Sequence, residues 1–360
     1  MRPRAERLAS LAADRELDAL LVREPVNLRW LTGFTGTNGL AVVESGADGR
    51  RVFVTDFRYV ERAAEEVGEG FARAEGQRDL LDAVAGALPE RRPLRLGFDD
   101  VHVSVRDHAR LAEALEGVEL VAAGGLVERL RAVTDPGEVA AIRAAAALAD
   151  DALAATLEGG LAGRTERAFA LALEDAMRHR GAPRPSFPAI VAAGPHGALP
   201  HAEAREAEIP RGALVVVDWG AQLDGYCSDC TRTLATGEVA DEALEVYEVV
   251  RRAQLAGLDA VRPGPSGQEV DAVARAVIDE AGHGERFGHG LGHGVGLEIH
   301  EDPRLSKAGE AALEAGNVVT VEPGVYLPGR FGVRIEDLVV VTGDGADVLS
   351  SHPKELTVVD

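Results

Sequence analysis

Two aspartates stand at the ends of neighbouring predicted strands, where paired carboxylates can do chemistry. Asp218 closes the apolar stretch Leu214–Val217, which we expect to be a strand buried on both faces. Asp229 follows on the far side of an Asp224-Gly225 turn signal. If the turn is centred just before Asp224, the two aspartates face each other. If Asp224-Gly225 itself forms the turn, they lie diagonally on the same surface, within about 5–8 Å in either case. Two like charges this close need a cation or a shared proton.

The same arrangement recurs near the end of the chain. Glu322 ends a predicted strand over Asn317–Val321, and Glu336 lies within a predicted strand over Val333–Val341. The midpoint of the two glutamates falls at Gly329, in a turn-forming segment, so we predict a second hairpin whose carboxylates face each other. Two hairpins that each carry a carboxylate pair can enclose two divalent cations about 3.5–4 Å apart.

A glycine- and histidine-rich run, residues 287–300, lies between the two predicted hairpins. His289 and His293 are spaced as on one face of a helix, but the alternating glycines argue against a helix. Read as an extended segment, the run places His289 and His293 on one face and His300 on the opposite one, with glycines that allow close approach. Taken alone, each motif is more typical of a salt bridge or a loop. Together, four carboxylates and a histidine indicate a site for hard divalent cations.

The elements that position these residues fall into two predicted domains. Residues 1–130 alternate helix and strand, which predicts a small α/β domain. Its expected helices cover 3–17, 57–67 and 105–117, its strands 19–22, 40–44, 51–55, 94–98 and 118–123, and a loop covers 25–39. A linker at 131–137 ends where Asp135-Pro136 starts a helix. Residues 138–360 combine strands with helices near 136–157, 165–180, 241–261 and 267–281, which predicts an α+β catalytic domain.

The composition excludes several classes of protein. The 360 residues contain 60 acidic and 38 basic side chains, for a formal charge of −22, which argues against a nucleic-acid or anionic-membrane partner. The sequence has no P-loop, G-x-S-x-G, H-E-x-x-H or G-x-G-x-x-G motif. No apolar stretch approaches the roughly 18 residues of a membrane span, and the charged N-terminus has no signal-peptide core, so we expect a cytoplasmic protein. Cys227 and Cys230 read as strand residues too far apart for a disulfide, and we expect buried thiols.

Several motifs resemble the M24 metallopeptidases of the pita-bread fold, and within them the aminopeptidase P and prolidase group. The stretches VVVDWGAQLDGYCSDCTRT (215–233), GHGLGHGVGLEIHE (288–301), VTVEPGVYLPG (319–329) and GVRIEDLVVV (332–341) carry the resemblance. NLRWLTGFTGTNG (27–39) and TDFRYVERA (55–63) resemble the creatinase-type N-terminal domain. The resemblance therefore spans essentially the whole chain. It implies an α/β N-terminal domain followed by a pita-bread catalytic domain.

The resemblance also implies roles for individual residues. The metal ligands would be Asp218, Asp229, His293, Glu322 and Glu336, with Asp229 and Glu336 bridging two divalent cations. Glu322 would also act as general base, and His201, His289 and His300 would contact the substrate or stabilise the tetrahedral intermediate, while Arg334 and Tyr326 would lie beside the site. The chain departs from the family's usual residues at Thr134, His196 and Trp219, and no departure removes a ligand.

The implied activity is hydrolysis of an Xaa-Pro bond by a metallopeptidase that uses two cations, typically manganese, with cobalt or zinc as alternatives. Our main interpretation is an Xaa-Pro aminopeptidase that releases the N-terminal residue of proline-containing peptides. The alternative is an Xaa-Pro dipeptidase (prolidase) restricted to dipeptides. A metal-free creatinase-like hydrolase or a non-catalytic binding module is disfavoured, because such relatives lose metal ligands and all five are present here. A homodimer is also implied by the resemblance.

Overall fold

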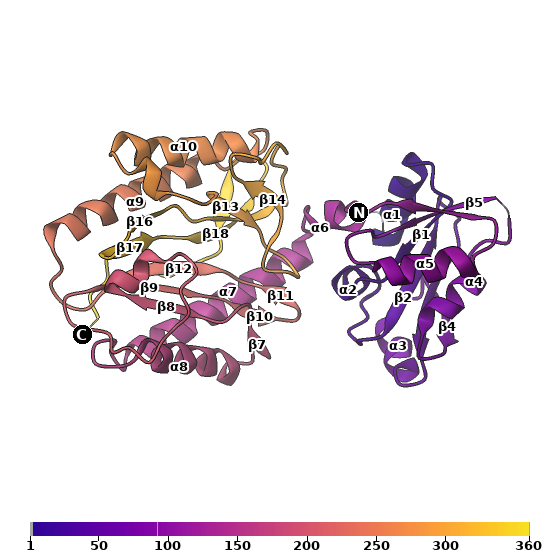
Figure 1. The fold of residues 1–360 in the computed structure, drawn as a ribbon, viewed down its shortest axis with the longest axis horizontal. Coiled ribbons are helices and arrows are strands. Elements are labelled where there is room, and N and C mark those ends of the chain that lie inside the picture. The colour runs from indigo at the N-terminus through magenta and orange to yellow at the C-terminus, as the bar shows by residue number, and fades with distance from the viewer. Residues whose placement is uncertain (1–2, 92, 360) are drawn as a thin grey trace. The chain divides into compact units, whose positions relative to one another are not determined.

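The computed structural model describes residues 3–91 and 93–359, and the contacts among them divide the chain into two compact units (Figure 1). The first unit covers residues 1–131 and the second covers residues 132–360. The chain is an α/β unit followed by an α+β unit, as the sequence predicted. Each unit has hydrophobic core clusters of its own.

A mixed sheet forms the centre of the first unit. Its strand order is β4-β3-β2-β1-β5-β6, with bounds β1 Ala19–Val22, β2 Gly39–Glu44, β3 Arg51–Asp56, β4 Ala72–Gly76, β5 Leu94–Phe98 and β6 Val118–Ala122. The helices are α1 Arg4–Asp14, α2 Pro25–Thr32, α3 Val60–Glu66, α4 Val84–Ala87, α5 Val105–Ala114 and α6 Leu126–Arg131, with a short 3₁₀ turn η1 Leu80–Ala83. Leu21, Val42 and Val54 point to the face where η1, α4 and α5 pack. Helix α6 contacts α1 and α2, helix α1 contacts β1 and β2, and helix α2 contacts β2.

Helix α2 corrects the loop that we expected over residues 25–39. The Glu24 side chain accepts a hydrogen bond from the Asn27 amide at 2.7 Å, and Pro25 occupies the first turn, where its fixed φ suits a helix. Gly33 ends the helix with a φ of 88°, a conformation that favours glycine. These capping signals were present in the sequence, but the eight-residue helix is too short to show a clear hydrophobic periodicity.

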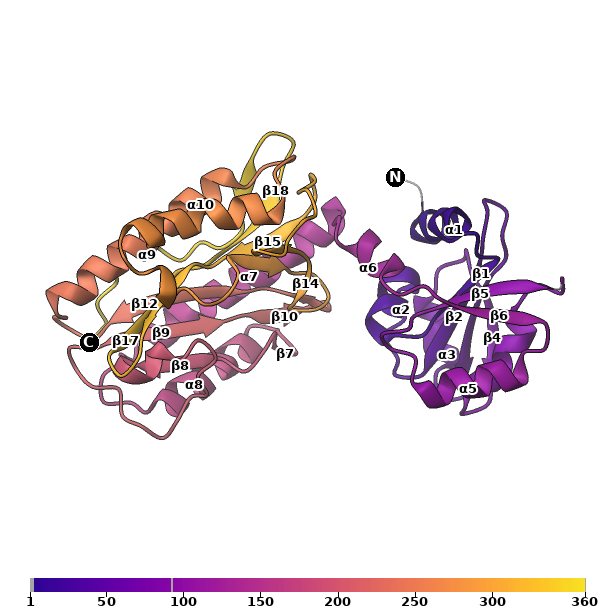
Figure 2. The same cartoon turned by 45° about the horizontal axis from the view of Figure 1, so that its top comes forward.

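The second unit places helices on both sides of its strands (Figures 1 and 2). Helices α7 Pro136–Leu157 and α8 Glu166–His179 share a core with β8 Ile190–Ala193, β9 Leu214–Trp219 and β12 Cys230–Ala235. Helices α9 Asp241–Ala260 and α10 Gly267–Glu280 share another with β15 Val318–Val321, β16 Gly324–Leu327, β17 Phe331–Arg334 and β18 Asp337–Val341. The remaining elements are β7 Arg184–Pro185, η2 Gly194–Ala198, β10 Ala221–Leu223, β11 Tyr226–Cys227, η3 Gly284–Arg286, β13 Gly292–Gly294, β14 Glu301–Leu305 and β19 Ala346–Val348.

The first predicted hairpin forms in the second of the two registers that we considered. Strand β9 pairs with β12 so that Asp218 is opposite Thr231, and β10 pairs with β11 around the Asp224-Gly225 turn. Both turn residues have positive φ, 48° for Asp224 and 85° for Gly225, as a two-residue hairpin turn of this kind requires. Asp229 therefore lies diagonally from Asp218. Cys227 and Cys230 are free and buried, as predicted.

The second predicted hairpin also forms with its midpoint at Gly329, but it is divided between two sheets. Val321 pairs with Asp337 in a sheet of order β14-β13-β15-β18-β19, and Gly324 pairs with Arg334 in the separate β16-β17 ribbon. The continuous strand that we expected over Val333–Val341 is thus interrupted at Ile335 and Glu336, between β17 and β18.

The glycine- and histidine-rich run is not extended throughout, which corrects our placement of His300. Only residues 292–294 form a strand, β13, and the chain then turns and returns as β14, with Gly294 opposite Glu301. The His300 ring consequently contacts the His293 ring, with centroids 4.4 Å apart. At Gly292 an added Cβ would lie 1.9 Å from the Thr320 carbonyl oxygen, so the glycines allow the close approach that the sequence suggested.

Among the described residues, no helix combines the length and apolar character needed to cross a membrane.

Candidate metal centre and active site

Three buried carboxylates from different elements meet at the centre of the second unit. Asp218 lies in β9, Asp229 lies just before β12, and Glu336 lies at the break between β17 and β18. One oxygen of each lies within 4.8 Å of the others, and the residues are 9%, 6% and 2% exposed. The two hairpins therefore bring together the carboxylates that the sequence singled out.

The protein compensates the three carboxylates only in part: Arg334 binds one oxygen of Asp218 and the Thr231 hydroxyl binds one oxygen of Glu336. Burial raises the pKa of Asp229 and Glu336 well above the usual range, and repulsion adds to it, from Glu336 on Asp229 and from Glu322 on Glu336. Asp218 Oδ1 and Glu336 Oε1 are buried without a hydrogen-bond partner among the described residues. Buried, unpaired carboxylate oxygens are costly unless a cation binds them. The chemistry of this donor set fits divalent cations.

His293 presents a nitrogen to the same cluster. Its Nδ1 donates to the Gly294 carbonyl oxygen at 3.0 Å, so in the neutral ring Nε2 carries the free lone pair. Nε2 lies 3.2 Å from Glu322 Oε1 and 3.6 Å from Asp229 Oδ2. Burial opposes ionisation of Glu322, yet a hydrogen bond from His293, which requires a proton on Nε2, lowers the pKa of Glu322 to about 2. Nε2 therefore serves either as a donor to Glu322 or, without that proton, as a metal ligand. The histidine and the fourth carboxylate are thus oriented toward the other three.

Arg334 connects the carboxylate cluster to a second histidine. Its guanidinium donates to Asp218 Oδ2 at 2.7 Å and to the Tyr326 hydroxyl at 2.9 Å. Because that hydroxyl accepts from Arg334, it donates to His289 Nε2, 3.0 Å away, while His289 Nδ1 donates to the Gly290 carbonyl. Both ring nitrogens of His289 are therefore engaged. The arrangement favours a positioning role for His289 and leaves His300 as the better candidate for a donor to an oxyanion.

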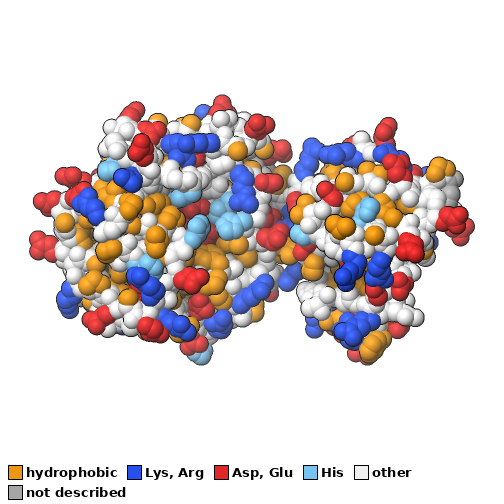
Figure 3. All heavy atoms as spheres, in the orientation of Figure 1, with side chains coloured by type: hydrophobic (Ala, Val, Ile, Leu, Met, Phe, Trp, Pro, Cys, Tyr) orange, Lys and Arg blue, Asp and Glu red, His pale blue; other side chains and the backbone are white. Residues whose placement is uncertain are grey.

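A cavity of about 710 Å³ opens onto the cluster. It is lined by predicted site residues, namely Asp218, Asp229, His293, Glu322, Glu336, His201, His289, His300 and Arg334. Tyr326 lies beneath the cavity wall, 7% exposed, and contacts the site through Arg334 and His289. Figure 3 shows histidine side chains gathered on one face of the second unit. A hydrophobic wall is contributed by Ala170, Leu171, Phe187, Pro188 and Ile190.

Arg304 also lines the cavity, and the sequence reasoning missed it. It projects from β14, four residues after His300, and is exposed. Within the described part of the chain no acidic side chain forms an ion pair with Arg304, whereas Arg167, another cation of the lining, lies 3.4 Å from Glu206. A basic residue shortly after the histidine motif was the available signal. The sequence alone did not place Arg304 in the cavity, because that position depends on the return of the chain in β14.

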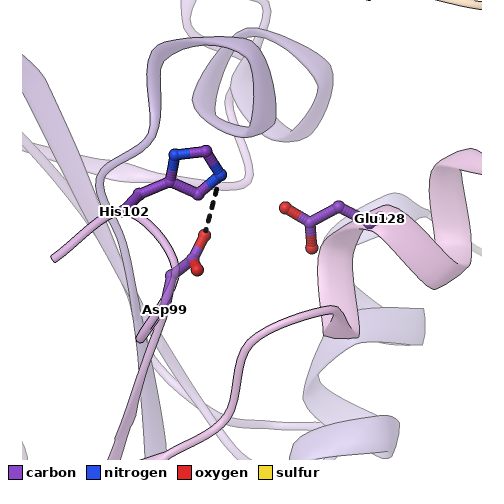
Figure 4. A group of neighbouring side chains, drawn as sticks. All are labelled: Asp99, His102 and Glu128. Carbon is purple, nitrogen blue, oxygen red and sulfur yellow. Dashed lines mark ion pairs between the residues drawn. The ribbon is translucent and has the colours of Figure 1, made fainter. Parts of the chain in front are cut away.

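A second group of possible ligands, Asp99, His102 and Glu128, lies in the first unit (Figure 4). It differs from the carboxylate cluster because the buried Asn27 amide donates to Glu128 at 2.5 Å and to Asp99 at 3.5 Å. His102 is 3.9 Å from Asp99, and its side chain is 40% exposed. The amide already joins the two carboxylates, so we assign this group a structural role.

Comparison with known proteins agrees with this geometry. The family model of metallopeptidase family M24 matches residues 140–343, and that of the creatinase/prolidase N-terminal domain matches residues 4–133. An Xaa-Pro dipeptidase of Pyrococcus furiosus is 35% identical over 99% of this chain and 100% of its own length. The structure of an Xaa-Pro dipeptidase from Bacillus anthracis superposes with a TM-score of 0.94, at 40% identity over 99% of both chains. That of an X-Pro aminopeptidase from Thermotoga maritima gives 0.87, at 34% identity over 96% of this chain and 99% of its own. The chain therefore belongs to metallopeptidase family M24 and is a peptidase with a creatinase/prolidase N-terminal domain and a pita-bread catalytic domain.

Proposed function

We propose that this protein is a divalent-metal-dependent Xaa-Pro dipeptidase. This was the alternative, and not the main, interpretation of the sequence. Relatives that match almost the whole chain, from Pyrococcus furiosus and Pyrococcus horikoshii, are named Xaa-Pro dipeptidases, and this supports the alternative over the aminopeptidase interpretation. The second candidate is Xaa-Pro aminopeptidase activity, because a similar structure from Thermotoga maritima is named an X-Pro aminopeptidase.

Arg304 is the observation that favours a dipeptide substrate. In an Xaa-Pro dipeptide a free carboxylate follows the proline directly, and the substrate has no further residues to bind. A guanidinium that lines the cavity without an acidic partner among the described residues can receive such a carboxylate through two parallel hydrogen bonds. A longer peptide would carry an uncharged amide at that position and would leave this cation unmatched.

The metal ligands in this proposal are Asp218, Asp229, His293, Glu322 and Glu336. Two divalent cations held there would polarise the scissile carbonyl and lower the pKa of a bound water. Manganese suits the oxygen-rich donor set, with cobalt or zinc as alternatives. The residues have distinct tasks: Glu322, ionised at neutral pH, accepts a proton from the attacking water and passes it to the proline nitrogen as the C–N bond breaks, and His300 donates to the oxyanion that develops on the substrate. His201, which lines the cavity, contacts the substrate.

The test is hydrolysis of Ala-Pro and of Ala-Pro-Ala by the manganese-loaded protein, with a chelator-treated sample as control. Cleavage of Ala-Pro alone is the expected result. Cleavage of the tripeptide at a comparable rate would establish the aminopeptidase instead, and failure to cleave either peptide while metal is bound would contradict both. The homodimer and the cytoplasmic location implied at the level of sequence remain predictions, and sedimentation equilibrium tests the former.

A further inference from the structure

A buried carboxylate outside the metal centre is used by none of the steps above. Glu166 begins helix α8 and is 1% exposed. It accepts hydrogen bonds from the backbone amide of Ala193 at 2.9 Å, from His196 Nδ1 at 2.8 Å and from the backbone amide of Arg205 at 3.1 Å. Arg205 Nε adds a longer contact of 3.5 Å. A carboxylate so buried is retained only where its partners satisfy it, and these partners come from one segment, residues 193–205.

The donors lie at the two ends of that segment. Ala193 ends β8 and His196 lies in the short 3₁₀ turn η2, whereas Arg205 lies twelve residues after Ala193. The two carboxylate oxygens bind different ends of the segment. Oε1 accepts a hydrogen bond from the Ala193 amide, Oε2 accepts one from the Arg205 amide, and His196 Nδ1 lies within hydrogen-bond distance of both oxygens. Glu166 therefore closes a loop, holding its beginning and its end against the first turn of α8.

The middle of the loop is part of the active-site cavity. Pro200, His201 and Glu203 line the cavity. The Pro200 carbonyl accepts a hydrogen bond from Arg334 at 3.1 Å, and Arg334 in turn donates to Asp218. Residues 202–205 belong to no helix, strand or turn, so no regular secondary structure fixes the position of His201 from that side. Glu166 supplies side-chain acceptors to both ends of the loop, and the Arg167 amide adds one backbone hydrogen bond to the Arg205 carbonyl at 2.9 Å.

We propose that Glu166 is a positioning residue for the reaction: by clamping both ends of the 193–205 loop it holds His201 in the cavity and the Pro200 carbonyl on Arg334. His196 belongs to the clamp as the donor that bridges both oxygens. The kinetic part of this proposal rests on the proposed Xaa-Pro peptidase activity, whereas the structural part does not.

The variant Glu166→Gln separates the clamp from simple packing. Glutamine has nearly the same volume but only one acceptor oxygen, and its amide nitrogen would face an N–H donor at the other end of the loop. One of the two backbone amides, that of Ala193 or that of Arg205, must therefore lose its hydrogen bond to residue 166. Glu166→Asp keeps both acceptors on a shorter stem and should restore part of the effect. The matched control is Glu138→Gln, another buried glutamate in the first turn of a helix, whose carboxylate binds the Asp135 amide and the Tyr226 hydroxyl, both at 2.8 Å.

Hydrogen exchange measured by mass spectrometry on the metal-loaded full chain tests the clamp without reference to activity. In Glu166→Gln, whichever of the Ala193 and Arg205 amides faces the glutamine nitrogen should exchange about tenfold faster or more, as expected for a lost hydrogen bond to a charged group, and Glu138→Gln should leave both amides unchanged. Unchanged exchange across residues 193–205 in Glu166→Gln would overturn the proposal, whatever the enzyme cleaves.

Kinetics then test whether the clamp acts through His201. Glu166→Gln should lower kcat/KM for Ala-Pro by about 10-fold or more while the bound-metal content stays at the wild-type value, and in a His201→Ala background the same change should have little further effect. Multiplicative losses in the double variant, or faster exchange without a kinetic effect, would overturn the positioning role. A wild-type protein that cleaves no Xaa-Pro peptide would instead refute the proposed function, and the exchange result would still stand.

Discussion

Glu322 and Glu336 are opposite each other in one hairpin register, yet neither is bonded to the other's strand. The pairs Val321–Asp337 and Gly324–Arg334 flank them on either side. The Glu322 amide donates to the Leu291 carbonyl at 2.8 Å, and the Glu336 amide donates to the Thr231 carbonyl at 3.0 Å. The hairpin is thus opened at the two glutamates, and each side is bonded to another part of the fold. This opening joins Glu336 to the Asp218–Asp229 hairpin and Glu322 to the His293 strand.

The carboxylate cluster predicts opposite effects of Asp229→Asn on the metal-free and the metal-loaded protein. Without metal, folding must either protonate Asp229 or bury its charge beside other carboxylates, and asparagine removes that cost, so the melting temperature should rise. With metal, the variant loses a ligand, so added manganese should no longer raise the melting temperature and turnover of Ala-Pro should be abolished. Differential scanning fluorimetry with chelator and with manganese measures both effects.

The control for that experiment is Asp224→Asn, an exposed aspartate in the turn of the same hairpin. Asparagine tolerates the positive φ of this position, so the control should keep the manganese-induced shift. A full manganese-induced shift in Asp229→Asn would contradict the assignment of Asp229 as a ligand.

The sequence was sufficient for those parts of the site that follow from local geometry. The alternation of side chains along strands, together with the turns at Asp224-Gly225 and Gly329, predicted which carboxylates share a surface. The break at Glu336 could not be predicted, because GVRIEDLVVV reads as one strand and the interruption is a bond to Thr231, 105 residues away. Helix α2 was missed because eight residues carry little periodic signal. Glu166 could not be predicted, because its partners follow it by 27 to 39 residues and no local pattern marks it. Arg304 could not be assigned, because its place in the cavity depends on the return of the chain in β14.

Arg304→Gln should discriminate between substrates by their C-terminal group. If Arg304 binds the substrate carboxylate, KM for Ala-Pro should rise about 10- to 100-fold, the effect of losing a hydrogen bond to a charged group, with a much smaller change in kcat. Ala-Pro-amide, which carries no carboxylate, should respond little to the substitution. Lys307→Gln, an exposed cation near Arg304 that does not line the cavity, is the matched control. Equal losses for the acid and the amide would argue against carboxylate recognition.

Asp56 predicts a loss of stability of the first unit in acid. Its buried carboxylate receives two hydrogen bonds from the Arg58 guanidinium, at 2.9 and 2.7 Å, and these hold the pKa of Asp56 well below its usual range. Since the unfolded chain protonates this aspartate near pH 3.9, its contribution is present above about pH 4 and is lost as the pH falls toward the lowered native value. Arg58→Met should therefore lower the stability at pH 7 and flatten the dependence of stability on pH below about pH 4.

Urea unfolding followed by Trp30 fluorescence measures this stability. Trp30 is 3% exposed in the first unit, and Trp219→Phe removes the second tryptophan of the chain. Arg62→Met is the control, because the Arg62 side chain is 51% exposed and reaches Glu66 only at 4.0 Å. A pH dependence that is equally steep in Arg58→Met and in the parent would refute the role of the Asp56–Arg58 pair.

Asp99→Asn should stabilise the first unit at neutral pH. Partial burial and the nearby Glu128 carboxylate raise the pKa of Asp99, so the folded state holds a proton there more tightly than the unfolded state does. The ionised form is accordingly disfavoured by folding at pH 7, and stability should increase as the pH falls through the raised value. Asparagine removes the repulsion and still offers an oxygen to the Val101 amide, which Asp99 binds at 3.1 Å. The expected gain is below about 1 kcal/mol, because the group is partly solvated.

Unfolding monitored by Trp30 should show this gain in stability at pH 7 and a smaller gain at pH 4, whereas Asp100→Asn, at the adjacent position, should change the stability at neither pH. A loss of stability in Asp99→Asn at pH 7 would mean that the charge itself holds Asn27 in place.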